Sequence, residues 1–202
     1  FESSKKECFV GTLSGLQHYS ADADRFTDIP LILQDGIIVE PNVAAIEELS
    51  NGDLLVGTAG QGLFKITNTH KGLVGISMEK RIPIPIVNAL HEDRNGNLWI
   101  SAGENGIFRI DRNQQLHCYQ KGANESEYTI SSICETPDKQ IYIGSLGKGL
   151  LKYNPTLDLF EPIIYANHPE LPVKSLLLAT PDEIYIGTDG YGLKVYNIQS
   201  RT

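Results

Sequence analysis

Glycine-rich strings that could cradle a phosphate group recur along this 202-residue chain, at first residues Gly11, Gly57, Ser101, Gly144 and Gly187. A phosphate-binding loop needs a strand before its glycines and, after them, a helix whose N-terminus holds the anion. Here each string is followed by another short apolar run, such as Leu63–Ile66, which predicts a second strand. The strings therefore predict hairpins, in which glycine supplies the positive φ angles of a tight turn, and they exclude a nucleotide loop.

Histidines and nucleophiles give no pattern of a reaction centre. The histidines show no i, i+2 or i, i+4 pairing, so that surface or capping roles are favoured over a metal site; they are His18, His70, His91, His117 and His168. No Gly-x-Ser-x-Gly elbow or other nucleophile motif is present. We therefore assign no catalytic residue and expect no cofactor and no metal.

The spacing of the strings identifies the architecture. Successive copies start 46, 44, 43 and 43 residues apart. A period in the low forties, built from short apolar runs, is typical of β-propeller blades. Each of the last four repeats has an inner strand starting 14 residues before the hairpin, at Val43, Val87, Ile130 and Val173. Its third residue is always small, which we attribute to crowding around the propeller axis. The fold predicted is all-β, with four-stranded blades.

We predict three full blades, at about 43–82, 86–120 and 129–165, and two partial blades, at 1–35 and 173–202. Phe1-Glu2 aligns with the tail of an inner strand, and the last repeat ends too early for an outer strand. These losses do not complement each other, so we interpret residues 1–202 as one incomplete propeller fragment, with a closed five-bladed ring as the alternative. An open fragment exposes an apolar blade face, and we expect it to self-associate.

The acidic residues Glu48, Glu92 and Glu135 hold one position of the repeat. This favours a structural role, such as capping a turn or pairing between blades, over a catalytic carboxylate pair. A net charge of −8 argues against nucleic-acid binding, and no apolar run is long enough to span a bilayer. Cys8, Cys118 and Cys134 are predicted to be buried, unpaired thiols, although a Cys118–Cys134 bridge is conceivable.

A ligand would bind at the mouth of the central channel, on loops held by rigid blades. Polar and aromatic groups there suit sugar hydroxyls and ring faces; the alternative is that they are ordinary solvated hairpin tips. The candidates on the hairpin loops are Gln61, Glu104, Asn105, Lys148, Asp189 and Tyr191. Two more candidates, Asn88 and Lys174, lie early in inner strands, from which their side chains would point into the channel.

The string Asn95-Gly-Asn-Leu-Trp-Ile-Ser101, followed by Gly106-Ile-Phe-Arg-Ile-Asp111, resembles the two-component regulator propeller repeat. The Gly57-Thr58 and Gly187-Thr188 pairs match the same pattern. Only one repeat keeps the tryptophan, and Leu178 replaces the acidic residue in the last repeat.

The resemblance implies part of a seven-bladed propeller in the periplasmic sensor region of a hybrid two-component histidine kinase of the Bacteroidetes type. It also implies oligosaccharide sensing, no kinase chemistry and no membrane contact in this segment. Two other functions are alternatives. A WD40-like interaction scaffold lacks its Gly-His and Trp-Asp marks here, and a propeller lyase or hydrolase requires histidines and acids clustered at the channel mouth.

Overall fold

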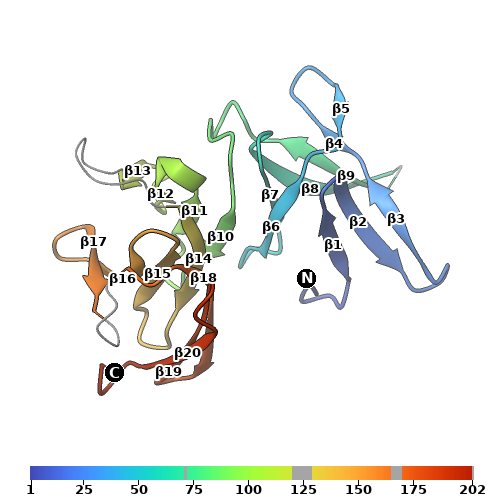
Figure 1. Ribbon diagram of the computed structural model, residues 1–202. Coiled ribbons are helices and arrows are strands. Elements are labelled where there is room, and N and C mark those ends of the chain that lie inside the picture. Colours follow the sequence, from blue (N-terminus) through green and yellow to red (C-terminus); the bar gives the residue numbers. More distant parts are fainter. Residues whose placement is uncertain (71, 120–128, 165–169, 202) are drawn as a thin grey trace. The chain divides into compact units, whose positions relative to one another are not determined.

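The computed structural model describes residues 1–70, 72–119, 129–164 and 170–201. Contacts divide the chain into two compact units, Phe1–Leu90 and His91–Thr202, and each is described by itself. The described residues form β-strands arranged in five sheets, with one 3-10 turn, η1 (Gly103–Asn105). Within most sheets the strands follow chain order and pair antiparallel, as the hairpin spacing predicts (Figure 1).

The first unit opens with a three-stranded sheet, whose strands are β1 (Phe9–Thr12), β2 (Gly15–Ser20) and β3 (Arg25–Ile29). An isolated antiparallel bridge joins Glu2 to Cys8, just before β1. The bridge agrees with the tail of an inner strand at Phe1-Glu2, and the alignment of the first repeat stays a prediction.

The second sheet of this unit has six strands in the order β5-β4-β9-β8-β7-β6. Four of them form the predicted blade: β6 (Val43–Glu48), β7 (Leu54–Thr58), β8 (Leu63–Thr69) and β9 (Gly72–Ser77). The other two, β4 (Leu31–Ile32) and β5 (Ile38–Val39), form a small hairpin that continues the sheet beyond β9.

Residues 25–33 therefore do not form one continuous outer strand. Pro30 interrupts the run: it has no N–H for an antiparallel ladder, and its carbonyl accepts a hydrogen bond from the Gly75 amide at 2.8 Å. Leu31 is fully buried, and a side chain at Gly75 would collide with it, because a Cβ there would lie 2.3 Å from Leu31 Cδ2. The chain therefore leaves the first blade after Ile29 and pairs with the second.

The second unit contains three sheets, in strand orders β10-β11-β12-β13, β14-β15-β16-β17 and β18-β19-β20. The first comprises β10 (Ala89–Glu92), which begins just before the unit boundary, β11 (Leu98–Ser101), β12 (Ile107–Ile110) and β13 (Leu116–Tyr119). The second comprises β14 (Ile130–Glu135), β15 (Ile141–Ser145), β16 (Gly149–Asn154) and β17 (Leu159–Ile163). The last comprises β18 (Val173–Thr180), β19 (Glu183–Thr188) and β20 (Leu193–Asn197).

Neighbouring sheets pack face to face through apolar side chains, as blades do. In the second unit, Trp99 and Ile107 of one sheet share a buried cluster with Ile130, Ile143 and Tyr153 of the next. The second strands of two blades, β7 and β15, are buried on both faces, which explains their apolar runs. The predicted fold class, an all-β, incomplete β-propeller of four-stranded blades, is confirmed. The interpretation of the chain as a single domain stays a prediction.

In two of the hairpin strings, the glycine that opens the string has a role other than the one predicted. Gly57 and Gly144 have no positive φ; instead, the next blade packs directly on them. A Cβ would lie 2.4 Å from Val87 Cγ1 at Gly57 and 2.4 Å from Val173 Cγ1 at Gly144. The small third residue of the inner strand lies opposite the same glycine, as Ser132 does for Gly144. Close approach of the next blade accounts for the glycine, whereas crowding at the axis as the reason for the small residue stays a prediction.

Candidate functional site

Gln61 lies at the rim of a 460 Å³ cavity in the first unit. The hairpin tip that carries it is held in place, because the amides of Gly60 and Gly62 both donate to the carbonyl of Pro85, at 3.0 and 2.7 Å. The backbone amide of Gln61 donates to Thr58 Oγ1 at 3.1 Å. The exposed carboxylate of Glu79 lines the same cavity. The hairpin tip and the segment after β9 thus present one side-chain amide and one carboxylate to the same cavity, which suits hydrogen bonding to a hydroxylated ligand.

Lys174 and Asp189 are brought together in the last sheet, where Nζ and Oδ1 lie 3.1 Å apart. Both side chains are more than half exposed, so the ion pair is worth little for stability. The Asp189 amide donates to the Pro172 carbonyl at 2.9 Å, which fixes the hairpin that also carries the exposed ring of Tyr191. Three candidates therefore lie on neighbouring segments of one blade.

The other candidates lie apart. Glu104 and Asn105 form the exposed tip of η1, and Lys148 is half-buried in the hairpin between β15 and β16. Within the described part of the chain, none of these three makes a side-chain hydrogen bond or ion pair with another candidate. Asn88 is half-buried immediately before β10. Gln61 and Asn88 belong to the first unit and the other six to the second, so the common channel mouth remains a prediction.

Sequence reasoning missed an aromatic cage around Arg109 of β12. The guanidinium carbon lies 5.4 to 5.6 Å from the ring centroids of Trp99, Tyr119 and Tyr153. Arg109 also donates to the Tyr153 hydroxyl and lies 3.4 Å from Asp158. The hydrogen bond from Tyr153 is the main cause that holds the pKa of Asp158 below its usual range.

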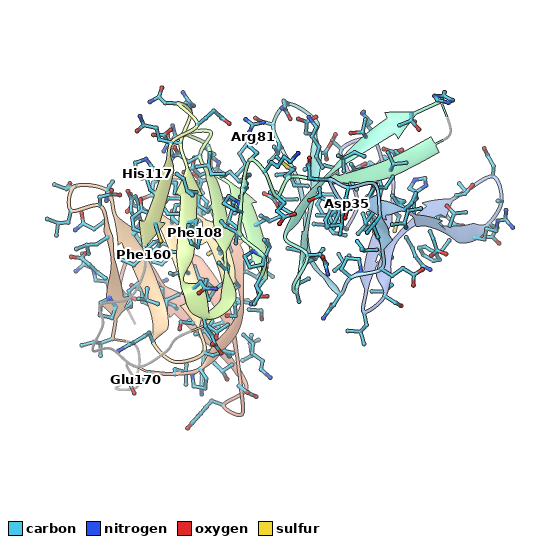
Figure 2. The ribbon with its side chains drawn as sticks, turned by 90° about the horizontal axis from the view of Figure 1, so that it is seen from above. Asp35, Arg81, Phe108, His117, Phe160 and Glu170 are labelled. Atoms are coloured by element: carbon cyan, nitrogen blue, oxygen red, sulfur yellow. The ribbon has the colours of Figure 1, made fainter. Side chains whose placement is uncertain are left out.

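This cage joins two blades, since Arg109 and Trp99 belong to one sheet and Tyr153 to the next. Phe160 of β17 (labelled in Figure 2) adds a further edge contact, with ring centroids 5.7 Å from Trp99. Burial is the first cause that raises the pKa of Tyr119. A 560 Å³ cavity lies beside the cage, but the Trp99 ring that lines it is buried and offers no face to a sugar. The arrangement holds two neighbouring blades together through non-covalent contacts. In the sequence, the tryptophan and arginine of one repeat were the signal that could have predicted it.

The repeated acidic residue also joins blades, as its fixed position predicted. Glu48 accepts hydrogen bonds from the amide and hydroxyl of Ser4 in the preceding blade, both at 2.6 Å. Glu135 accepts from the amide of Arg94 in the same way, at 3.1 and 3.2 Å. The hydrogen bonds from Ser4 lower the pKa of Glu48. The structural role predicted for this position is therefore confirmed at these two residues.

The exception at Leu178 now has a physical reason. The amide that donates to Glu135 belongs to Arg94, which lies 41 residues earlier in the chain. Arg94 is the second residue after Glu92, the acidic residue of the preceding blade. The same position in the next blade is Pro137, two residues after Glu135, and proline has no N–H to donate. A carboxylate at position 178 would be left without this partner, so an apolar residue is better placed there.

The described histidines do not gather into one site. His18 lies 3.9 Å from Glu7, His91 lies 3.7 Å from Glu135, and His117 lies 3.1 Å from Asp111. No group of three histidine, cysteine or acidic residues within the described ranges could hold a metal ion. His168 lies outside the described residues.

The cysteines differ from the prediction in burial. Cys134 is a buried free thiol, and burial raises its pKa to about 12. The bridge between Cys134 and Cys118 is therefore not formed. Cys118 is exposed and Cys8 is half-buried, because Cys118 lies on an outer strand, where one face meets solvent. The expectation of burial is correct only for Cys134.

Comparisons with known proteins agree with this architecture. A model of the two component regulator propeller family matches residues 82–104, and no curated protein matches the chain. The extracellular domain of the hybrid two component system BT3049 from B. thetaiotaomicron superposes with a TM-score of 0.76 at 18% identity, over 96% of this chain and 26% of that chain.

Two further structures are similar. PorZ, a surface component of the type-IX secretion system of Porphyromonas gingivalis, has a TM-score of 0.69 at 13% identity, over 97% of this chain and 31% of that chain. Virginiamycin B lyase from Staphylococcus aureus has a TM-score of 0.62 at 14% identity, over 98% of this chain and 69% of that chain. At such identities the likeness shows the fold alone.

The chain spans only 26% and 31% of the length of the first two of these proteins. None of the helices in the described residues has the length and apolar character needed to cross a membrane. The residues that carried the sequence resemblance, Asn95 to Ser101, lie inside the matched segment. Residues 82–104 thus carry a two component regulator propeller repeat within a β-propeller fold, which confirms the resemblance recognised in the sequence.

Proposed function

We propose that this chain is a ligand-sensing segment of the propeller region of a hybrid two-component sensor histidine kinase of the Bacteroidetes type. The observation that carries the proposal is the regulator propeller repeat at residues 82–104, set in blades that pack as in an extracellular domain of such a system. The segment itself is non-catalytic, and it transmits a binding event instead of performing a reaction. The extracellular assignment of that neighbour supports a periplasmic location.

The ligand proposed is an oligosaccharide, bound by the hairpin tips. Tyr191 offers an exposed ring for stacking on a pyranose face, and the Lys174–Asp189 pair offers both a donor and an acceptor to vicinal hydroxyls. Because the tips are tied to neighbouring segments by backbone hydrogen bonds, binding does not require the loops to be ordered first. Such preorganisation favours selective recognition of a weakly binding polar ligand.

A thermal-shift screen against neutral and acidic oligosaccharides tests this proposal, with the protein that contains the complete propeller. We expect a dose-dependent rise in Tm with at least one sugar, because a ligand that binds only the folded state stabilises it. Tyr191→Ala should weaken the shift. Asn113→Ala is the matched control, since this exposed residue lies at the opposite end of its sheet from the hairpin tips. No shift across a broad panel would refute sugar sensing.

The location has a separate test. An alkaline phosphatase fusion placed directly after the propeller should be active in cells, because this reporter folds only on the outer side of the inner membrane. An inactive fusion, together with an active cytoplasmic reporter at the same site, would contradict the periplasmic assignment.

A further inference from the structure

The cavity beside Gln61, in the first unit, combines an apolar wall with two polar side chains. Its volume of 460 Å³ lies within the range of small-molecule sites. Among the described residues that line it, only Gln61 and Glu79 have polar side chains. The apolar wall is formed by Leu33, Pro83, Ile84 and Pro85. A ligand that fills this cavity needs an apolar surface and a small number of polar groups.

The segment between β9 and β10, which carries most of this wall, is tied to the blade at both ends. At one end the Met78 amide donates to the Leu63 carbonyl at 2.8 Å. At the other end the Val87 amide donates to the Thr58 carbonyl, also at 2.8 Å. Ile84, between them, is only 5% exposed. The wall is therefore preformed, and a ligand does not have to order it.

The hairpin tip forms the rest of the cavity through two glycines that differ in their surroundings. A Cβ at Gly62 would lie 2.8 Å from the Ile84 carbonyl oxygen, so the tip and the segment after β9 touch at this point. A Cβ at Gly60 would meet no atom within 4 Å, although Gly60 lines the cavity as well. The tip thus closes the cavity at one glycine and leaves room for a ligand at the other.

The Glu79 carboxylate is available to a ligand. Its residue follows β9, where the backbone amide donates to Ser77 Oγ at 3.2 Å, and its side chain is exposed. Within the part of the chain that the structure describes, no hydrogen bond or ion pair reaches the carboxylate, and Lys80 and Arg81 do not line the cavity. A carboxylate beside an apolar wall gains most from a cationic donor, because charge-assisted hydrogen bonds are about twice as strong as neutral ones.

These features together select one class of sugar. The C–H faces of a pyranose ring can pack on proline and aliphatic side chains, and ring hydroxyls can bond to the side-chain amide of Gln61. An acidic sugar would bring a second carboxylate close to Glu79, and the two charges would repel each other. A sugar with a protonated amino group would instead place a positive charge there.

We propose that this cavity binds a hexosamine residue with a free amino group, whose ammonium pairs with the Glu79 carboxylate while a ring hydroxyl bonds to the Gln61 side-chain amide. The inference rests on the oligosaccharide sensing proposed above, and it narrows the ligand to a cationic amino sugar.

Isothermal titration of the protein that contains the complete propeller with the disaccharide of glucosamine tests this inference, at about pH 6, which is below the usual pKa of an amine. We expect its N-acetylated counterpart to bind at least about tenfold more weakly, because the acetyl group removes the charge. Glu79→Gln should raise the Kd of the glucosamine disaccharide at least about tenfold and abolish the preference over the acetylated sugar. Glu40→Gln, at an exposed residue of the same unit that does not line the cavity, is the matched control and should leave the Kd unchanged.

The outcomes separate this inference from the proposed function. If the glucosamine disaccharide does not bind, or binds equally well to the wild type and to a folded Glu79→Gln variant, the inference is overturned. A neutral oligosaccharide that still binds in that case, and that Tyr191→Ala weakens, would leave the proposed function standing. Binding that depends on Glu79 and not on Tyr191 would confirm the cavity as a site of its own. Unchanged circular dichroism would show that each variant is folded.

Discussion

Gly144→Ala should disrupt the contact between two blades, since the added methyl group has no room. Its Cβ would lie 2.4 Å from Val173 Cγ1 and 2.7 Å from Ser132 Oγ, and contacts below 3.0 Å require the surroundings to move. Val173 is fully buried and begins the inner strand of the next blade, so it cannot yield without displacing β18. Overpacking of this kind costs roughly 1–3 kcal/mol.

A urea titration followed by fluorescence measures this cost. Trp99 is the only tryptophan and lies in the same unit, so its emission reports on the unfolding of the blades concerned. A loss of about 2 kcal/mol, with an m-value of about 2 kcal/mol/M, lowers the midpoint by about 1 M. Ser101→Ala is the matched control, because Ser101 holds the same repeat position and already has a Cβ. It should lose only its 2.7 Å hydrogen bond to the Ile130 carbonyl, about 1 kcal/mol.

A double-mutant cycle with Val173→Ala isolates the collision. Removing the valine methyl groups makes room for the alanine at position 144, so the two costs should be less than additive, by about 1 kcal/mol or more. If Gly144→Ala shifts the midpoint no further than Ser101→Ala does, or if the cycle is additive, close approach is not the reason for this glycine.

Three further predictions concern single groups. Because the folded-state pKa of Asp158 is lowered, its contribution to stability is present above the ordinary carboxyl pKa of about 3.9 and is lost as the pH falls through the lower value. Asp158→Asn should therefore make Tm less dependent on pH between about pH 5 and pH 3, and an unchanged pH profile would contradict this. Leu178→Glu alone should lower Tm, whereas in a Pro137→Ser background, which restores an amide donor, it should raise Tm; equal effects in both backgrounds would refute the capping rule. Titration with a thiol reagent at about pH 8 should label Cys118 rapidly and Cys134 only on unfolding, since the latter is buried with a pKa of about 12; rapid labelling of both would show that the blade packing around Cys134 is wrong.

Much of this fold follows from the order of residues along the chain. Strands in one blade are close in sequence, so alternation, turn residues and a repeat of 43 to 46 residues determine the hairpins and the blade pattern. The structural role of Glu48 and Glu135 followed in the same way, because a catalytic group does not need to occur once in every repeat. These features are local or periodic, and both properties can be read from one sequence.

Only the tertiary structure decided which side chains meet across blades. The Arg109 cage joins residues from β12 and β16, and the transfer of Leu31 to the neighbouring sheet depends on the space that Gly75 leaves for it. The sequence could place each candidate binding residue on a hairpin tip or an inner strand. Only the tertiary structure showed that Lys174 and Asp189 form an ion pair. Packing between sheets depends on shape and distance in three dimensions, and the positions that satisfy it have no fixed separation along the chain.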